Sequence, residues 1–406
     1  MIRRFLTLGS GEAVSRLLYL LAFVAIARGL GKAALGQFGY AFSVTSYLVL
    51  TVQQGFDQIA VRAVSRDRSL LERYVRGLFG LRLIIAIAVY TALTAYLSWH
   101  RAENPLLLLF GLICFTTASA PRWAFQVLSP IRFAIASTLS QVVFCGGAWA
   151  TMQGHGVLWA AGFYVLGDAL SAAYLLLALR NQVRTAPAWS PHFWRVLAKQ
   201  SWPLSVSSLL GMIVYNFDIL ALGWLASPAD LGLYLACYRC ATVFSPLLSV
   251  LQLSILPAFA NAFPDRERMR AGIWAVAVPS AIAAAVVALL LTLFPVEVLS
   301  VIYGSGYTGG AALLRVLSWS LPVQVLRSIL RQVLFAAHLQ RWDTLNMSLA
   351  ALTSILIDLT LIPRLGPMAC AIATLGSESV LLAGSAAVLR LHVFSRTALP
   401  SNQNQG

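Results

Sequence analysis

Residues 272–294, GIWAVAVPSAIAAAVVALLLTLF, carry no charged side chain, and three arginines (Arg266, Arg268 and Arg270) stand just before them. A helix of about 20 apolar residues is long enough to cross the hydrocarbon core of a bilayer. Basic residues at one end of such a helix favour the cytoplasmic side of the membrane. The stretch therefore predicts a transmembrane helix that begins at the cytoplasmic face.

The rest of the chain has the same character. Hydrophobic residues make up 59% of the 406 residues and charged residues only 11%, and the mean hydropathy is +0.78. Soluble domains carry about 25% charged residues, and one or two soluble cores could not bury this much apolar surface. We therefore expect lipid to be the solvent for most of the protein.

Apolar runs of the required length predict an all-α, polytopic membrane protein of about 12 transmembrane helices. The predicted spans lie near residues 6–28, 36–56, 77–99, 105–128, 131–152, 156–180, 202–225, 231–260, 272–294, 311–337, 344–363 and 366–391.

The basic residues predict the orientation. The net charge is +15, and all but two (Lys32 and Lys199) of the 29 basic residues are arginine. Most of the basic residues outside the spans lie in every second loop. The loops between them hold only Arg28, Lys32, Arg101 and Arg364. The positive-inside rule then places both termini in the cytoplasm. Because the charge is distributed over loops, we expect anionic lipid and no nucleic acid as its partner.

The chain divides at its longest polar stretch, which separates residues 1–180, an N-terminal six-helix lobe, from residues 202–406, a C-terminal one. Gly36 and Gly232 open the second span of each lobe in similar sequences. An even number of spans per repeat predicts parallel repeats related by a pseudo-two-fold axis along the membrane normal. Between the lobes, residues 181–201 contain the helix-start pair Ser190–Pro191 and predict a cytoplasmic, interfacial linker helix.

An ordered set of short motifs resembles the polysaccharide-transporter, or oligosaccharidyl-lipid flippase, family of the multidrug/oligosaccharidyl-lipid/polysaccharide exporter superfamily. In the first half the set comprises Ala27–Gly31, Leu35–Tyr40, Gly55–Asp57 and Arg62. In the second half it comprises Asp218, Leu222, Gly223, Gly232, Tyr234, Arg239, Pro257, Tyr303, Gly304, Tyr307, Gly366, Ala369 and Ala371. The resemblance covers nearly the whole chain.

This resemblance implies a function without covalent chemistry. It implies flipping of undecaprenyl-diphosphate-linked oligosaccharide, an O-antigen or exopolysaccharide repeat unit, across the bacterial inner membrane by alternating access. The implied partners are this lipid-linked substrate and the bilayer, with other polysaccharide-assembly membrane proteins as further candidates.

Ionisable residues inside the spans are the strongest functional signal that the residues themselves provide. Each costs about 2.5–3.5 kcal/mol at a helix centre on insertion scales, so it needs a partner or a water-filled cavity. Arg82 and Arg122 lie near the cytoplasmic ends of their spans, from which they are expected to reach the headgroups. Glu12 and Arg16 are four residues apart, a spacing that also allows a pair within one helix.

Four arginines are the candidate substrate-binding residues: Arg16, Arg239, Arg327 and Arg331. A diphosphate in a cavity of low dielectric constant requires permanently charged donors, and guanidinium groups contact phosphate through two parallel hydrogen bonds. We expect these arginines to form a cationic cavity, the alternative being structural ion pairs.

Three buried acids, Asp168, Asp218 and Glu378, have two interpretations that the sequence leaves open. They are counter-ions of the arginines, or they are sites that couple transport to H⁺ or Na⁺, since a desolvated carboxylate can titrate. Asp358 is expected to reach water near the outer end of its span or to cap a helix. Apart from a coupling ion, no cofactor or metal is expected, because the histidines lack metal-ligand spacing.

Other function classes are less well supported. The sequence contains no Walker motif and no loop with clustered catalytic residues, so we expect a protein that is not an enzyme. An ion-coupled exporter of drugs or cations from the same superfamily is the main alternative, but cationic substrates would require acidic cavities. A polysaccharide polymerase or ligase would require a longer outer loop than residues 295–310.

Overall fold

The structure, a computed structural model, describes residues 2–101, 104–243 and 265–395, together with Ile255, Phe259 and Ala262, and the side chains from Val14 onward. In this part of the chain the regular secondary structure is helical, and it contains no strand. The all-α prediction is confirmed.

The chain divides into two compact units, which are described separately. Unit 1 comprises Met1–Met212 and Ser227–Leu235, and unit 2 comprises Ile213–Ala226 and Ala236–Gly406. The helices of the first part of the chain are α1 (Ile2–Gln53), α2 (Phe56–Arg66), η1 (Arg68–Leu70), α3 (Leu71–Trp99), α4 (Pro105–Gly111), α5 (Ile113–Ser119), α6 (Arg122–Leu128), α7 (Pro130–Thr151), α8 (Val157–Leu179), α9 (Pro191–Leu225) and α10 (Pro228–Thr242). Those that follow are α12 (Arg266–Leu293), α13 (Pro295–Tyr303), η2 (Ser305–Gly310), α14 (Ala311–Ser318), α15 (Ser320–Ala336), α16 (Gln340–Leu365), α17 (Pro367–Leu389) and η3 (Arg390–Phe394).

Most helices are long and apolar enough to span a membrane. Nine single helices of the described residues meet this test, and the bent pair Pro105–Ser119 and Arg122–Leu128 brings the number to ten. One of the nine, α1, contains two predicted spans, because Gly31 takes a left-handed conformation (φ 78°) that interrupts the helix. The span predicted at 231–260 begins in α10, but residues 244–254 lie outside the described part of the chain.

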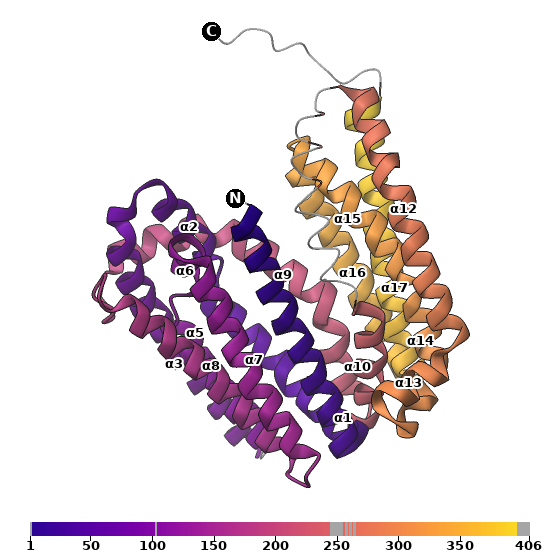
Figure 1. The fold of residues 1–406 in the computed structure, drawn as a ribbon, viewed down its shortest axis with the longest axis horizontal. Helices are drawn as coiled ribbons and strands as arrows, with labels where there is room; N and C mark the ends of the chain where they lie inside the picture. Colours follow the sequence, from indigo (N-terminus) through magenta and orange to yellow (C-terminus); the bar gives the residue numbers. More distant parts are fainter. Residues whose placement is uncertain are drawn as a thin grey trace. The chain divides into compact units, whose positions relative to one another are not determined.

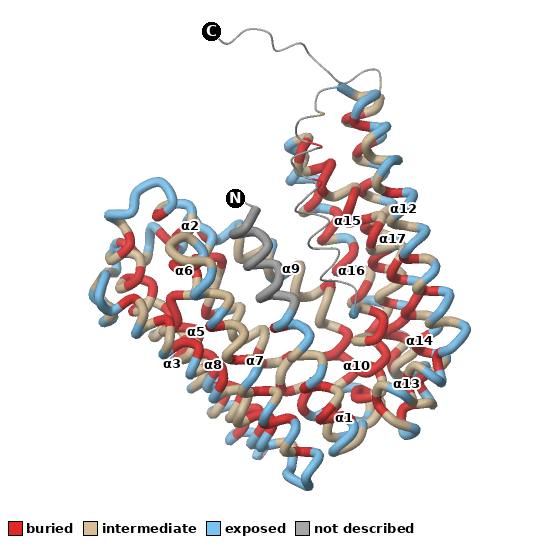
Figure 2. Tube along the Cα trace, viewed as in Figure 1, coloured by how far each residue is buried: buried red, intermediate tan, exposed pale blue. Residues whose placement is uncertain are grey.

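The outward faces of these helices suit lipid. On α12, Val278, Ile282, Val286, Leu289 and Leu293 are exposed, although all five are apolar. Figure 2 shows exposed residues following one side of α12 while buried ones follow the other. An apolar face of this length would be unfavourable in water but is stable against acyl chains.

Unit 1 has several packed cores. In the first, Phe38 of α1 stacks on Phe144 of α7 with ring centroids 5.8 Å apart and meets Phe110 of α4 edge-on at 5.1 Å. Tyr164 of α8 meets Phe144 edge-on at 4.9 Å. Aromatic pairs in these geometries add to the free energy gained by burying their surface. In Figure 1, α7 and α8 run side by side within this unit.

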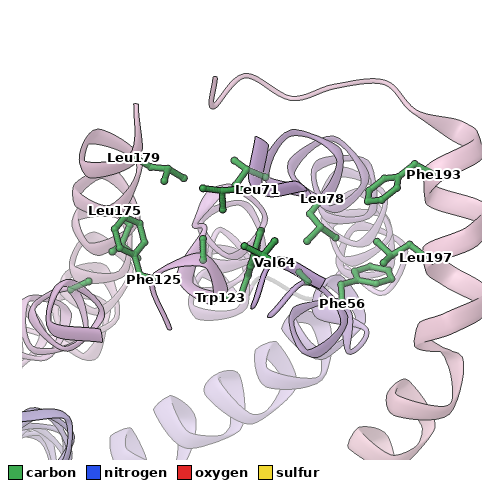
Figure 3. Close-up of a cluster of buried hydrophobic side chains, with 14 residues drawn as sticks. Phe56, Val64, Leu71, Leu78, Trp123, Phe125, Leu175, Leu179, Phe193 and Leu197 are labelled. Carbon is green, nitrogen blue, oxygen red and sulfur yellow. The ribbon is translucent and has the colours of Figure 1, made fainter. Parts of the chain in front are cut away.

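The second core of unit 1 joins α2, α3, α6, α8 and α9 (Figure 3). Trp123 and Phe125 of α6 lie in it, and the N-terminal part of α9 contributes Phe193 and Leu197. Trp194 donates a hydrogen bond of 2.8 Å from its indole N–H to the Gly77 carbonyl oxygen. Within the segment 181–201, predicted to hold an interfacial helix, residues 191–201 are thus the beginning of α9, and they pack on α3.

A close helix crossing involves the two glycines of the repeated motif. A Cβ on Gly36 of α1 would overlap the backbone carbonyl of Pro228, and one on Gly232 of α10 would overlap the carbonyl of Lys32. All four residues belong to unit 1. Only glycine permits backbones to approach this closely, so both glycines have a packing role.

In unit 2, α12, α15 and α17 share an apolar core that includes Ala284, Val325, Ile329 and Leu389. Next to it, α16 presents a buried row at four-residue intervals, which places its members on one face of the helix. The row consists of Asn346, Ala350, Ser354, Asp358 and Ile362. It brings polar groups into the interior of unit 2, where the candidate site lies.

Candidate functional site

Arg327 and Glu378 form an ion pair inside unit 2. Arg327 is on α15 and Glu378 on α17, and the guanidinium Nε lies 2.7 Å from the carboxylate Oε2. The two side chains are only 7% and 3% exposed. Gln324, one turn earlier on α15, donates to Glu378 Oε1 at 3.3 Å, and Arg327 also shares a hydrogen bond with the Tyr215 hydroxyl of α9. Each charge therefore has a buried partner, as membrane interiors require.

Arg331 lies one turn further along α15 and has a partner of its own. It donates to both oxygens of Asp343 on α16, with distances of 3.0–3.1 Å. Its guanidinium carbon also lies 5.1 Å from the centroid of the Phe335 ring. This two-bond geometry is the one that guanidinium groups use for carboxylate and phosphate alike.

Arg239 approaches the same part of unit 2 from α10. The neighbouring Tyr238 is within electrostatic reach of Arg239, Asp218 and Glu378. Arg239 in turn acts on Tyr303 at the end of α13. Three of the four predicted substrate-binding arginines, Arg239, Arg327 and Arg331, are therefore in one unit.

The fourth, Arg16, is in unit 1. Its side chain lies on the exposed side of α1, next to the buried Ser15, whose hydroxyl lies 3.2 Å from that of Thr138. The predicted pairing with Glu12 lies outside the described side chains.

Asp218 and Asp358 form a second polar group within unit 2. Asp358 is completely buried, and its Oδ2 accepts a hydrogen bond of 3.2 Å from Ser354. Asp218, on α9, accepts from the backbone N–H of Ile219 at 2.8 Å. Both aspartates contact Cys370 of α17, whose thiol lies 3.8 Å from the Asp218 carbonyl oxygen. Two carboxylates are thus near each other in a dry interior.

The expectation that Asp358 reaches water near the outer end of its span is wrong. Asp358 lies on the buried face of α16, so its side chain points between helices. The side chain is too short to bring the carboxylate from there to the surface. The sequence signal was available: Asn346, Ser354 and Asp358 are polar residues separated by multiples of four.

In unit 1, Asp168 of α8 is paired with Arg122 of α6. One carboxylate oxygen accepts from Arg122 and the other from the Thr116 hydroxyl. Asp168 and Arg122 line a cavity of about 150 Å³, together with Tyr164 and Gln141. This volume is enough for a few water molecules.

The predicted headgroup contacts of Arg82 and Arg122 are also wrong. Arg82 is 3% exposed, and its guanidinium lies 2.8 Å from Asp57 Oδ1. Arg122 turns toward Asp168. Both arginines are close to span ends in the sequence, but the bends at Gly55 and Pro121 place acids within their reach.

Several partners were missed by the sequence interpretation. Asp343 lies just before the predicted span 344–363, although it is in the first turn of α16 and pairs with Arg331. Tyr215, Tyr238 and Gln324 had no distinguishing signal, because uncharged polar residues are common in spans. Among the described residues, no group of three His, Cys, Asp or Glu side chains is arranged to hold a metal ion.

The sequence was compared with models of protein families and with proteins of known description. The sequence profile of the family described as "Polysaccharide biosynthesis protein" matches residues 1–263. No protein with a curated description matches the chain.

Solved structures share the fold at low sequence identity. The inward-facing conformation of a multidrug resistance MATE family transporter of the MOP superfamily matches with a TM-score of 0.74 at 14% identity, over 93% of this chain and 97% of that one. The lipid II flippase MurJ in an inward closed conformation matches with a TM-score of 0.77 at 13% identity, over 94% and 87%. The eukaryotic MATE transporter AtDTX14 matches with a TM-score of 0.62 at 16% identity, over 96% of both chains. The fold is therefore that of the MOP transporters, and the chain is a multi-pass membrane protein.

Proposed function

The chain belongs to the polysaccharide biosynthesis protein family, and from this we infer that it is a flippase for an undecaprenyl-diphosphate-linked oligosaccharide. The substrate would be an O-antigen or exopolysaccharide repeat unit that crosses the bacterial inner membrane by alternating access. The likeness of the fold to a lipid II flippase supports this proposal. No bond of the substrate is made or broken, so the protein would act without catalysis.

The placement of Arg327 and Arg331 is the observation that carries the proposal. They are two guanidinium groups one turn apart on α15, inside a span. A diphosphate carries at least two negative charges, and two guanidinium groups at this spacing can contact both phosphates. An exporter of cationic drugs would gain nothing from such groups.

Both arginines are held by carboxylates, so substrate binding would be an exchange of partners. The diphosphate would replace Glu378 at Arg327 and Asp343 at Arg331. Protonation of Glu378 would favour this exchange, because a neutral carboxyl group holds a guanidinium much less tightly. In this way Glu378 would link substrate binding to the uptake of a proton.

The remaining candidates have separate roles in this proposal. Arg239 and Arg16 would be further contacts of the substrate. Asp218, with Asp358 beside it, would be a further site for H⁺ or Na⁺, since two nearby buried carboxylates repel each other when both are ionised and no cation lies between them. Asp168 would remain a counter-ion of Arg122.

The test is complementation of surface-polysaccharide production in a bacterial strain that lacks its own flippase. Replacement of Arg327 alone would leave Glu378 buried and unpaired, so we use the double variant R327M/E378Q, which removes both charges. We expect it to reach the membrane in normal amounts and to lose complementation. The matched control is R364A, which removes an exposed arginine at the end of α16.

Full complementation by R327M/E378Q would contradict a substrate role for Arg327. For Arg239 and Arg331, alanine should remove a charge-assisted contact of about 1.5–3 kcal/mol, or at least roughly tenfold in affinity. Lysine should restore function only in part, because it keeps the charge and loses the two-bond geometry. Drug resistance conferred by the wild-type chain without any polysaccharide would favour the exporter alternative.

A further inference from the structure

Unit 1 contains a second pocket that the proposed transport does not use. It lies between α2 and α9 and has a volume of about 560 Å³. Its lining includes Ile59, Arg62, Ala63 and Arg66 of α2 and Gln200 and Leu204 of α9. The lining therefore combines two cationic side chains with polar and apolar ones.

The backbone around the pocket is built to hold the two helices together. Gln54 and Gly55 both take positive φ (40° and 68°), which turns the chain sharply from α1 into α2. The Ser205 hydroxyl of α9 donates to the Gln54 carbonyl oxygen at 2.7 Å. A Cβ on Gly55 would lie 2.8 Å from Leu204 Cβ, so glycine is what allows this approach. The pocket is thus part of the folded unit.

The two arginines of the pocket share their side of α2. They are four residues apart and exposed, and like charges at this spacing repel each other by a few tenths of a kcal/mol. Among the described residues, neither has an ion-pair partner. An anion between them would remove this repulsion.

Every acid close to the pocket in the sequence is engaged elsewhere. Asp57 pairs with Arg82, and Glu72 pairs with Arg76. Asp67 accepts a hydrogen bond from the Ser69 backbone N–H at 2.9 Å. The Ser69 hydroxyl, and next to it this backbone N–H, lower the pKa of Asp67. Since these carboxylates have their own donors, the pocket keeps its positive charge.

We propose that this pocket binds the phosphate headgroup of an anionic phospholipid, with Arg62 and Arg66 as its ligands. The guanidinium groups would hold the phosphate, Gln200 would hydrogen-bond the headgroup, and Ile59, Ala63 and Leu204 would contact the first part of the acyl chains. The pocket lies at the arginine-rich end of the unit 1 spans, which the sequence predicts to be cytoplasmic. Anionic lipids concentrate in that leaflet and attract basic residues by about 1 kcal/mol each.

The test counts lipids on the purified full-length protein by native mass spectrometry. The probes are phosphatidylglycerol and phosphatidylcholine of the same acyl composition. For the wild-type chain we expect preferential retention of phosphatidylglycerol. For R62Q/R66Q we expect its affinity to fall at least tenfold while retention of phosphatidylcholine stays the same. A63F keeps both charges but fills the pocket, and it should also lose the preference.

The matched control is R180Q/R184Q, which removes two exposed arginines, also four residues apart, outside the pocket. It should behave like the wild-type chain. An equal loss in this control, or undiminished binding in R62Q/R66Q and A63F, would overturn the proposal. Displacement of the lipid by micromolar inorganic pyrophosphate would also overturn it, because it would show a site for a soluble diphosphate. The assay involves no transport, so its outcome is independent of the proposed flippase function.

Discussion

The guanidinium of Arg327 and the carboxylate of Glu378 meet at 2.7 Å between α15 and α17, and both side chains are almost completely buried. Removing one charge from a buried pair leaves the other without compensation, which costs about 3–5 kcal/mol. Removing both charges together is often neutral. The single and double variants of the pair should therefore differ in stability, and this difference measures the structural role of the pair separately from its role in transport.

We expect E378Q to lower the melting temperature of the detergent-solubilised protein strongly, and R327M/E378Q to recover most of the loss. The control is E72Q, which breaks the pair between Glu72 and Arg76, whose side chains are 42% and 32% exposed. Exposed pairs contribute about 0–1 kcal/mol, so E72Q should change little. If E378Q and E72Q had equal effects, the Arg327–Glu378 pair would not be a buried interaction in the folded protein.

The glycines of the α1–α10 crossing give a second prediction. G36A and G232A should each destabilise unit 1, because the added methyl group would overlap a backbone carbonyl that cannot move independently. Overpacking of this kind typically costs about 1–3 kcal/mol. Thermal unfolding of the purified variants measures it.

The matched control for the glycines is G146A on α7, where an added Cβ meets no atom within 4 Å. Because alanine is a better helix former than glycine, G146A should be neutral or slightly stabilising. Unchanged melting temperatures for both G36A and G232A would show that α1 and α10 do not cross as closely as the structure indicates.

A further prediction concerns the buried acids and the dependence of transport on pH or Na⁺. If Asp218 or Glu378 binds the coupling ion, transport by the folded fraction of D218N or E378Q should lose its dependence on pH or Na⁺. D358N should act like D218N, because the two carboxylates share one environment near Cys370. D168N is the comparison, since Asp168 is held by Arg122 and Thr116.

The measurement is uptake of labelled lipid-linked oligosaccharide into proteoliposomes under imposed pH or Na⁺ gradients. Retention of full ion dependence in D168N, D218N, D358N and E378Q alike would leave these acids as counter-ions only.

The orientation of the chain in the membrane, which we inferred from the basic residues of the loops, can be tested directly. Reporter fusions after residues 70, 190 and 400 should report the cytoplasm, and fusions near residues 102 and 305 the opposite side. The physical reason is the arginine content of the loops, which disfavours their translocation. Activity of a reporter that works only outside the cytoplasm at position 190 would contradict both the orientation and the division into two six-helix halves.

The membrane fold was predictable because its signal is local. The absence of charge in residues 272–294 requires a lipid environment whatever the helix packs against, and the structure forms α12 there. The two spans within α1 were also predictable, since Gly31 interrupts the helix between them. Hydropathy is a property of a single segment, so no tertiary contact was needed to read it.

The sequence alone therefore determined the class of fold and the approximate positions of most spans. It did not determine which charges are buried, as Arg82, Asp343 and Asp358 show. It could not determine which charges meet, because partners such as Arg331 and Asp343, or Arg122 and Asp168, are brought together by turns between helices. Nor could it place Asp358, whose fully buried position depends on which face of α16 meets its neighbours. Only the tertiary structure decided these pairings, because the energy of a charge inside a membrane depends on the groups within a few ångströms of it.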